Sequence, residues 1–491
     1  MPRKRDKDTE TVNLTKSKAL TAGFSAVLCF AKTCDIEKKN KVWYIAYVNL
    51  KHRLKGGCAM RIIVDAEKII GKIKPMHGVG QPPFAGTNFS MFKYLKDAGI
   101  PYSRLHDVGG AYGGYRWVDI PNIFRDFDND PTDPDSYDFE FTDLLIKALF
   151  ENGVEPFFRL GVTIENDAMI KAYRIYPPAD YNKWAVICEH IIRHYTEGWA
   201  KGFEYDIKYW EIWNEPDNYE DIYENQMWRG TKQQYYELYE IASKHLKKCF
   251  PHLKIGGYGS CGFYDILSVF VSSAKSSPRM EYFIEFFDGF LEHVKKNDCP
   301  LDFFSWHSYD NIENNRIYAK YARARLDEAG FTHTETTCNE WNSEVEKRGT
   351  AHHAAVTCAM MIAFQQGPLD SAMFYDARYG TGIYGSMFNP LTKEPFLTYY
   401  AFKAFDELYK LGSEVETTID ESGVYAMAAR KDNQLIILIA NPLENEIPLD
   451  IKVNGTIRKC VLTGGRGLNM QIVKPQTIDE NSFLLVYADI D

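Results

Sequence analysis

Two glutamates in short tryptophan- and asparagine-containing segments are the first candidates for chemistry in this chain. Glu215 lies in a Trp-Asn-Glu-Pro segment, and Glu340 lies in an Asn-Glu-Trp-Asn segment. Two carboxyl groups roughly 5–5.5 Å apart, one protonated and one ionised, can cleave a glycosidic bond with retention of configuration. Their environments would have to raise the pKa of one carboxyl group and lower that of the other. The neighbouring amide of Asn214 could bind a sugar hydroxyl beside the reacting centre.

The elements that must position these glutamates form a repeating pattern from Lys72 onward. Short β-branched or aromatic runs alternate with amphipathic stretches, which predicts an α/β fold of the (β/α)8 TIM-barrel type. The predicted strands are residues 73–78, 101–106, 154–160, 207–213, 253–258, 302–307, 332–339 and 371–376. The glutamates follow the fourth and seventh strands, so both would face the catalytic end of one barrel. Taken singly, each could instead be a helix-capping or surface-loop residue, but their joint position favours catalysis.

Several motifs resemble glycoside hydrolase family 39, the β-xylosidase and α-L-iduronidase family of the large retaining (β/α)8 clan. They are the segments 75–78, 104–106, 213–216, 307–309 and 340–342, within a resemblance that runs from about residue 75 to 409. The resemblance implies that Glu215 is the acid/base and Glu340 the nucleophile, with Tyr309 touching the nucleophile. It also implies a first sugar site lined by His77, His106, Asn214, His307, Tyr309 and Asp376.

The substrate class follows less directly from the resemblance. Tyr309 occupies the place where the iduronidase branch has a lysine that helps to hold a carboxylate, so a neutral sugar fits better. The acidic segment typical of xylosidases after the eighth strand is replaced by residues 374–380, where Arg378 could bind a different hydroxyl pattern or an acidic substituent. Trp341 is the tryptophan predicted to stack on sugar, although core packing is the default for such a residue.

These features predict an exo-acting β-xylosidase that releases xylose-like residues by double displacement, without a cofactor. The alternatives within the family are an α-L-arabinoside, a β-glucoside or galactoside, or a uronide as substrate. A non-catalytic carbohydrate-binding protein is the alternative from another class.

Two weaker patterns in the sequence could indicate a dinucleotide site or a metal site. Residues 257–262 read Gly-x-Gly-x-x-Gly, which is typical of dinucleotide binding and would indicate an oxidoreductase. This segment lies in the fifth unit with no clear helix cap after it, so we expect a loop that needs glycine flexibility. His77, His106 and His307 could converge on a metal, but hydrogen bonding to sugar hydroxyls explains them as well, and no metal site is predicted.

The ends of the chain differ from the barrel segment at 73–411. Alternating strands after Gly412 predict a small β-sandwich-like domain over 412–491, with a strand at 60–72 joining it. The basic extension at 1–59 could be a signal peptide, with an apolar run at 19–31. We favour a second interpretation, in which translation of the native protein starts at Met60 and the extension is not part of it.

The composition of the chain argues against some classes of binding partner. The 491 residues include 57 lysines and arginines against 67 acidic residues, and the formal charge of -10 argues against nucleic acid or an anionic membrane as partner. The expected partner is an oligosaccharide or small glycoside, and a homo-oligomer is left open. The seven cysteines from Cys188 onward form no Cys-x-x-Cys pair. They indicate reduced thiols and a cytoplasmic location, with secretion through residues 1–31 as the alternative.

Overall fold

The structure is a computed structural model. It describes residues 59–84, 88–108, 118–163, 175–270, 276–379, 384–420, 423–465, 468–474 and 476–490. Residues 1–58 lie outside these ranges, and with them the predictions of a signal peptide and of a start at Met60. Within the described ranges, no helix combines the length and apolar character needed to cross a membrane.

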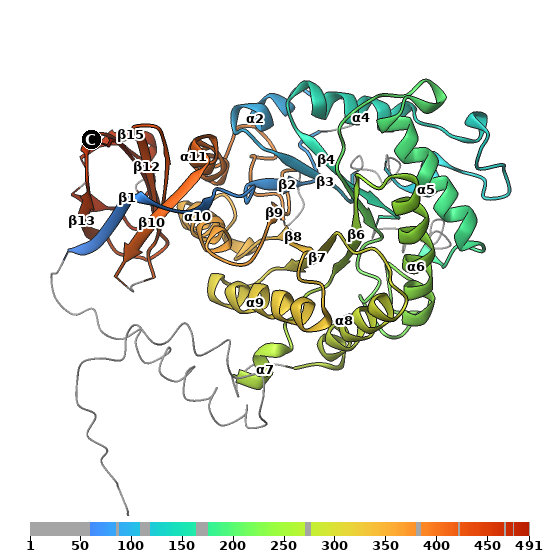
Figure 1. Cartoon of the computed structure of the whole chain (residues 1–491). Coiled ribbons are helices and arrows are strands. Elements are labelled where there is room, and N and C mark those ends of the chain that lie inside the picture. The colour runs from blue at the N-terminus through green and yellow to red at the C-terminus, as the bar shows by residue number, and fades with distance from the viewer. Residues whose placement is uncertain are drawn as a thin grey trace, which may run out of the picture. The chain divides into compact units, whose positions relative to one another are not determined.

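Eight strands, hydrogen-bonded in parallel in sequence order, close a barrel (Figure 1). They are β2 (Gly78–Gly80), β3 (Tyr102–Leu105), β4 (Glu155–Leu160), β5 (Tyr209–Ile212), β6 (Lys254–Ser260), β7 (Phe303–Ser308), β8 (Glu335–Trp341) and β9 (Ser371–Phe374). The (β/α)8 fold class predicted from the sequence is confirmed.

Helices surround the barrel and cover its apolar outer face. The α-helices are α2 (Phe92–Asp97), α3 (Ile120–Ile123), α4 (Glu140–Glu151), α5 (Tyr181–Thr196), α6 (Lys232–Cys249), α7 (Ile266–Phe270), α8 (Pro278–Lys296), α9 (Ile312–Ala329), α10 (Ala351–Gln365) and α11 (Leu397–Leu411). The described 3-10 segments are η1 (Pro134–Ser136), η4 (Trp199–Lys201) and η5 (Val345–Lys347). Helix α6 begins with a capping box in which Thr231 and Gln234 each hydrogen-bond the backbone of the other.

The first barrel strand lies further along the chain than predicted. Residues 73–77 form the turn that enters the barrel, and β2 is the short segment 78–80. Glycine at 78 allows the close approach of β9, because a Cβ there would lie 2.9 Å from the carbonyl oxygen of Ala372. A glycine-rich strand has little β propensity, so the sequence gives almost no local signal for where this strand begins.

A nine-stranded sheet forms the C-terminal β-domain, in the order β15-β14-β17-β12-β11-β10-β1-β13-β16. Its strands are β1 (Met60–Lys72), β10 (Ser413–Ile419), β11 (Tyr425–Lys431), β12 (Gln434–Asn441), β13 (Ile447–Val453), β14 (Thr456–Gly464), β15 (Leu468–Val473), β16 (Thr477–Ile478) and β17 (Ser482–Asp489). Strand β1 pairs antiparallel with β10 and parallel with β13. Its alternate residues Met60, Ile62 and Val64 are buried in the core of this domain.

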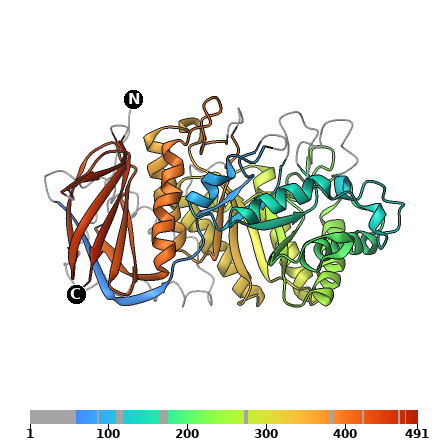
Figure 2. The same ribbon diagram turned by 90° about the horizontal axis from the view of Figure 1, so that it is seen from above.

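The β-domain packs on α10 and α11, which lie between its sheet and the barrel (Figure 2). Both faces of β12 are therefore covered. Ile437 and Ile439 point into the domain's own core, whereas Ile436 and Leu438 join the core that the barrel helices share. This double burial explains why β12 is continuously apolar instead of alternating.

Candidate active site

The barrel brings Glu215 and Glu340 together around His307. Glu215 follows β5, Glu340 lies near the end of β8, and His307 lies near the end of β7. Nδ1 of His307 is 2.8 Å from Oε1 of Glu215 and 3.4 Å from Oε2 of Glu340. One ligand atom from each of the three side chains lies within 4.8 Å of the others. Two glutamates that are 125 positions apart in the sequence thus face one another across a single imidazole ring.

Donors hold both oxygens of the Glu340 carboxylate. NH1 of Arg104 donates to Oε1 at 2.9 Å, and the hydroxyl of Tyr309 donates to Oε2 at 2.7 Å. Arg104 also donates to Glu211 at 2.8 Å and to Oδ1 of Asn214 at 2.5 Å. A buried guanidinium with fixed donor directions therefore orients both the carboxylate and the neighbouring amide. The site prediction did not include Arg104, although it stands in the Arg-Leu-His motif.

Glu211 supports Arg104 from inside the barrel. Its side chain is fully buried and also accepts hydrogen bonds from Ser305 and from Asn339, both at 2.6 Å. The pairing of β8 with its neighbours is irregular between Cys338 and Trp341. This bulge lets the consecutive residues Asn339 and Glu340 both reach the barrel interior.

The backbone after β5 turns sharply to present Glu215. Trp213 and Glu215 have positive φ angles of 74° and 44°, a region that non-glycine residues seldom adopt outside functional sites. The amide nitrogen of Asn218 donates to Oε2 of Glu215 at 2.9 Å. Glycine is needed opposite this turn, because a Cβ at Gly259 would lie 3.1 Å from both Oδ1 of Asn214 and Nε2 of His307. The glycines at 257–262 therefore make room for this site and do not open a helix.

The two glutamates and His307 form one titrating group. Burial raises the pKa of Glu340 and the charge of Glu215 raises it further, against the opposing effects of His307 and Arg104. Burial also acts to raise the pKa of Glu215, but the hydrogen bond and charge of His307 and the amide of Asn218 leave it below its ordinary value. Burial lowers the pKa of His307, yet the charges of both glutamates leave it raised. The surroundings therefore shift the two carboxyl groups in opposite directions, with the pKa of Glu340 raised and the pKa of Glu215 lowered.

Comparison with known sequences finds similar glycoside hydrolases. The profile of Glycosyl hydrolases family 39 matches residues 96–329. A β-xylosidase from Geobacillus stearothermophilus is 22% identical over 397 residues, which cover 71% of this chain and 68% of the relative. A β-xylosidase from Caldicellulosiruptor saccharolyticus is 24% identical over 432 residues, which cover 79% and 77%. Over the matched residues the chain is similar to glycosyl hydrolase family 39. It is a glycoside hydrolase, and its substrate is a carbohydrate.

Solved structures share the fold of this chain. A family 39 β-xylosidase from Caulobacter crescentus superposes with a TM-score of 0.60 at 16% identity, covering 87% of this chain and 99% of that one. A glucosidase from Croceicoccus marinus gives a TM-score of 0.67 at 21% identity, covering 89% and 100%. The family match ends before Glu340, so the contacts of β8 alone place that residue opposite Glu215.

Two residues predicted to line the sugar site lie elsewhere in the barrel. His77 precedes β2, at the amino-terminal end of the barrel, where Nε2 lies 3.1 Å from the carbonyl oxygen of Gly99 and 3.8 Å from Asp406. The prediction for His77 is wrong because β2 starts after it. The three histidines considered as metal ligands therefore do not converge.

The prediction that Trp341 stacks on sugar is also wrong. Its ring is 1% exposed and packs edge-on against Phe364 of α10 and Phe374 of β9. Adjacent strand residues point to opposite faces, so the inward position of Glu340 turns Trp341 outward into the helix layer.

The remaining predicted residues lie at the catalytic end of the glycosidase. Nε2 of His106 is 4.0 Å from Oε1 of Glu340 and 3.1 Å from Asp107. Asp376 is fully buried after β9, with Arg378 NH2 3.3 Å from its Oδ2. Burial raises the pKa of Asp376 to about 7, although the charge of Arg378 acts to lower it.

A polar wall, formed by Gln81, Asp107 and Tyr375, lies beside Glu340 and was not among the residues predicted from the sequence. Nε2 of Gln81 donates to the hydroxyl of Tyr375 at 2.6 Å, and that hydroxyl donates to Asp107 at 2.8 Å. Gln81 and Asp107 end β2 and β3 and have positive φ angles of 49° and 53°. Tyr384 lies beside this wall, with its ring 5.4 Å from that of Tyr375. Correct placement of β2 would have identified Gln81 as a strand-end residue.

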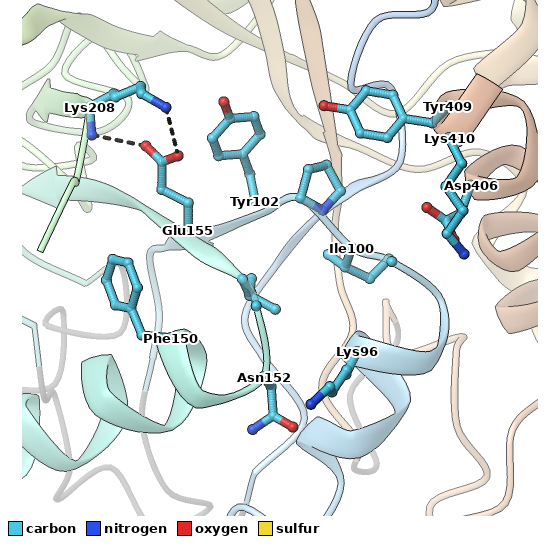
Figure 3. A pocket seen from close by; sticks show the side chains of 14 residues that line it. Lys96, Ile100, Tyr102, Phe150, Asn152, Glu155, Lys208, Asp406, Tyr409 and Lys410 are labelled. Atoms are coloured by element: carbon cyan, nitrogen blue, oxygen red, sulfur yellow. Dashed lines mark hydrogen bonds and ion pairs between the residues drawn. The ribbon is translucent and has the colours of Figure 1, made fainter. Parts of the chain in front are cut away.

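A cavity of about 690 Å³ lies at the other end of the barrel from the glutamate pair (Figure 3). Its lining includes Tyr102 and Glu155, at the starts of β3 and β4, and Asp406 and Tyr409 of α11. Figure 3 shows the ion pair of Glu155 and Lys208 on one side of this cavity. Neither glutamate of the candidate active site lines it.

We predict that His77→Gln lowers stability without changing substrate binding. The imidazole is fully buried against Asp406 and Tyr409, so its loss should cost about 1–3 kcal/mol of unfolding free energy. Urea unfolding and steady-state kinetics check this, with His106→Gln as the matched variant expected to change kcat/KM. A large rise in KM for His77→Gln would contradict its structural placement.

Proposed function

We propose that this chain is an exo-acting, retaining β-xylosidase in which Glu340 is the nucleophile and Glu215 the acid/base. The observation that supports this most strongly is the approach of both carboxylates to within 4.8 Å around His307. Retaining enzymes need the two carboxyl groups roughly 5–5.5 Å apart, whereas an inverting mechanism needs room for a water molecule between them. The relatives from Geobacillus and Caldicellulosiruptor are both β-xylosidases, which supports the substrate.

In the first step, Glu340 attacks the anomeric carbon while Glu215 protonates the departing glycosidic oxygen. Glu340 then holds the glycosyl group as an ester, and Glu215, now ionised, takes a proton from the water that attacks the same carbon. Water's oxygen becomes the anomeric hydroxyl and Glu340 leaves as a carboxylate, so the configuration is inverted twice and retained overall.

The first step needs an ionised Glu340 and a protonated Glu215, whereas the raised pKa of Glu340 and the lowered pKa of Glu215 favour the opposite arrangement. Nδ1 of His307 contacts both carboxylates. His307 can pass its Nδ1 proton to Glu215 and accept the proton of Glu340 at the same nitrogen, which leaves Glu340 ionised and Glu215 protonated. Arg104 and Tyr309 favour this state, because each donates a hydrogen bond to Glu340.

Buried polar atoms at the site supply contacts for sugar hydroxyls. Nδ2 of Asn214, Nε2 of His307 and Oε1 of Gln81 are buried without a hydrogen-bond partner among the described residues. Buried polar atoms of this kind are normally satisfied. Because Arg104 holds Oδ1 of Asn214, its Nδ2 is directed as a donor toward a hydroxyl beside the reacting carbon.

The charges favour a neutral sugar over a uronide. One nitrogen of the Arg378 guanidinium lies 3.3 Å from Asp376, so part of this arginine is directed at a side chain of the protein and not at substrate. Tyr309 donates to Glu340, so it is not available to a substrate carboxylate either. A uronide would bring a further negative charge to a site that already contains Glu215, Glu340 and Asp107.

We predict that hydrolysis of an aryl β-xyloside releases β-xylose first, with the α-anomer appearing later by mutarotation. Proton NMR during the first minutes of reaction distinguishes the anomers, and release of the α-anomer first would contradict the double displacement. A panel of aryl arabinosides, glucosides, galactosides and uronides tests the sugar. We expect the uronide to react at least about tenfold more slowly than the xyloside, and failure on every glycoside would overturn the proposed function.

A further inference from the structure

Three potential metal ligands meet between helices α5 and α6, on the outside of the barrel. They are Glu189 of α5 and His245 and Cys249 of α6. Nε2 of His245 lies 2.6 Å from Oε2 of Glu189 and 3.9 Å from Sγ of Cys249. One ligand atom from each side chain lies within 4.8 Å of the others. All three residues are partly exposed, so an ion from solvent can reach them.

The helix geometry creates this cluster. His245 and Cys249 are four residues apart, so they lie one above the other on the same face of α6. Glu189 approaches from the adjacent helix and is 56 positions from His245 in the sequence. The sequence alone predicts no metal site, because its metal ligands do not occur as a cluster along the chain. The His-x-x-x-Cys pair of α6 gains a third potential ligand, Glu189, only when α5 packs against α6.

The surrounding contacts orient the carboxylate for such a role. Nε of Arg193 donates to Oε1 of Glu189 at 2.8 Å, which leaves Oε2 directed at His245. Hydrogen bonds from residues that do not bind the metal themselves fix the orientation of the residues that do. Arg193 also pairs with Glu197, which offsets its positive charge beside the cluster.

We propose that Glu189, His245 and Cys249 bind a thiophilic divalent cation of the Zn²⁺ class, with water as the fourth ligand. Imidazole, carboxylate and thiolate together are ligands that Zn²⁺ accepts in tetrahedral sites. Bonds of about 2.0–2.3 Å place tetrahedral ligand atoms about 3.3–3.7 Å apart. The ion would part Glu189 from His245 by about 1 Å or less and draw Cys249 slightly inward.

Binding releases the thiol proton of Cys249 and requires neutral His245. The thiolate and the Glu189 carboxylate then balance the two positive charges of the ion. The existing contact between Glu189 and His245 is replaced by bonds from both residues to the metal.

The cluster joins the two helices that flank β5 in the sequence. Helix α5 precedes β5, and α6 follows the loop after it. A metal bond between these helices would therefore stabilise the barrel on both sides of β5. It contacts neither glutamate of the active site, so we expect it to affect stability and not the chemical step.

Cobalt(II) added to the full-length, metal-free protein tests the proposal. We expect one equivalent to produce a sulfur-to-cobalt charge-transfer band in the near ultraviolet, which a carboxylate and histidine site alone cannot produce. Zn²⁺ at about one hundred times its dissociation constant should compete for this site and raise the unfolding temperature by roughly 2–5 °C. The group of Glu215, His307 and Glu340 contains no thiolate, so metal bound there does not mimic the band.

Matched variants show which residues bind the cobalt that produces the charge-transfer band. Cys249→Ser should abolish it, whereas Cys299→Ser should keep it. His245→Gln and Glu189→Gln should each weaken cobalt binding at least about tenfold, whereas His252→Gln, at an exposed histidine beyond α6, should not. Absence of the band in the unmodified chain, its persistence in Cys249→Ser, or unchanged affinity in both His245→Gln and Glu189→Gln would overturn the proposal. The last two variants keep the test valid if Cys249→Ser does not fold.

Discussion

Replacing Glu340 by glutamine is expected to lower kcat/KM for an aryl β-xyloside by about 10⁴-fold or more. The amide keeps the size of the side chain and one acceptor oxygen but cannot attack the anomeric carbon. An activated leaving group should not restore the rate, because the missing step is bond formation to Glu340. Stopped-flow measurement should therefore show no burst of released phenol.

Glu215→Gln should respond differently to the leaving group. With a poor leaving group the loss should be about 10²–10⁴-fold, because no acid protonates the departing oxygen. With a strongly activated phenol the first step should survive, and the glycosyl-enzyme should accumulate as a burst because no base activates water. Azide should rescue Glu215→Ala on the activated substrate by occupying the space of the deleted carboxylate, and the product should be the β-glycosyl azide.

Glu335→Gln is the matched control for both substitutions. Glu335 lies at the other end of β8, where it pairs with Lys254 and accepts a hydrogen bond from Tyr209 at 2.8 Å. This variant should retain activity. A burst from Glu340→Gln, or unimpaired turnover of a poor substrate by Glu215→Gln, would contradict the assigned roles.

The sequence predicted the glutamate pair because strand ends follow from local patterns. Strong β-branched and aromatic runs marked β5 and β8, and the closure of a parallel barrel requires their carboxyl ends to meet. His77 was misplaced because β2 consists of only three residues, two of them glycine, so its start has almost no local signal. The error of five residues in the start of this strand moved a predicted sugar ligand to the opposite end of the barrel.

The residues that hold and orient Glu340 could not be predicted from strand patterns alone. Asn339 and Glu340 both reach the interior only because of the bulge in β8, and a bulge arises from the register with neighbouring strands. Arg104 and Glu211 look like ordinary charged residues in the sequence. Their roles follow from burial beside each other, since a barrel interior admits a charge only when it is paired.

Arg104→Gln is expected to impair catalysis most strongly at low pH. Arg104 lowers the pKa of Glu340, so removing its positive charge should raise that pKa. Glu340 attacks only when ionised, so the rising limb of the kcat/KM profile should move to higher pH. At neutral pH we expect a loss of roughly 10²-fold or more, because the amide of Asn214 also loses the donor that orients it.

Arg159→Gln separates this effect from a general loss of stability. Arg159 forms a buried ion pair with Asp119 at 2.7 Å on the neighbouring strand β4, without a contact to Glu340 among the described residues. Removing either arginine takes the cation away from a buried carboxylate and should cost about 3–5 kcal/mol of unfolding free energy. Only Arg104→Gln should shift the pH profile, because only its guanidinium donates to Glu340. Equal shifts in both variants would show that the pKa of Glu340 depends on the barrel's overall charge and not on the Arg104 hydrogen bond.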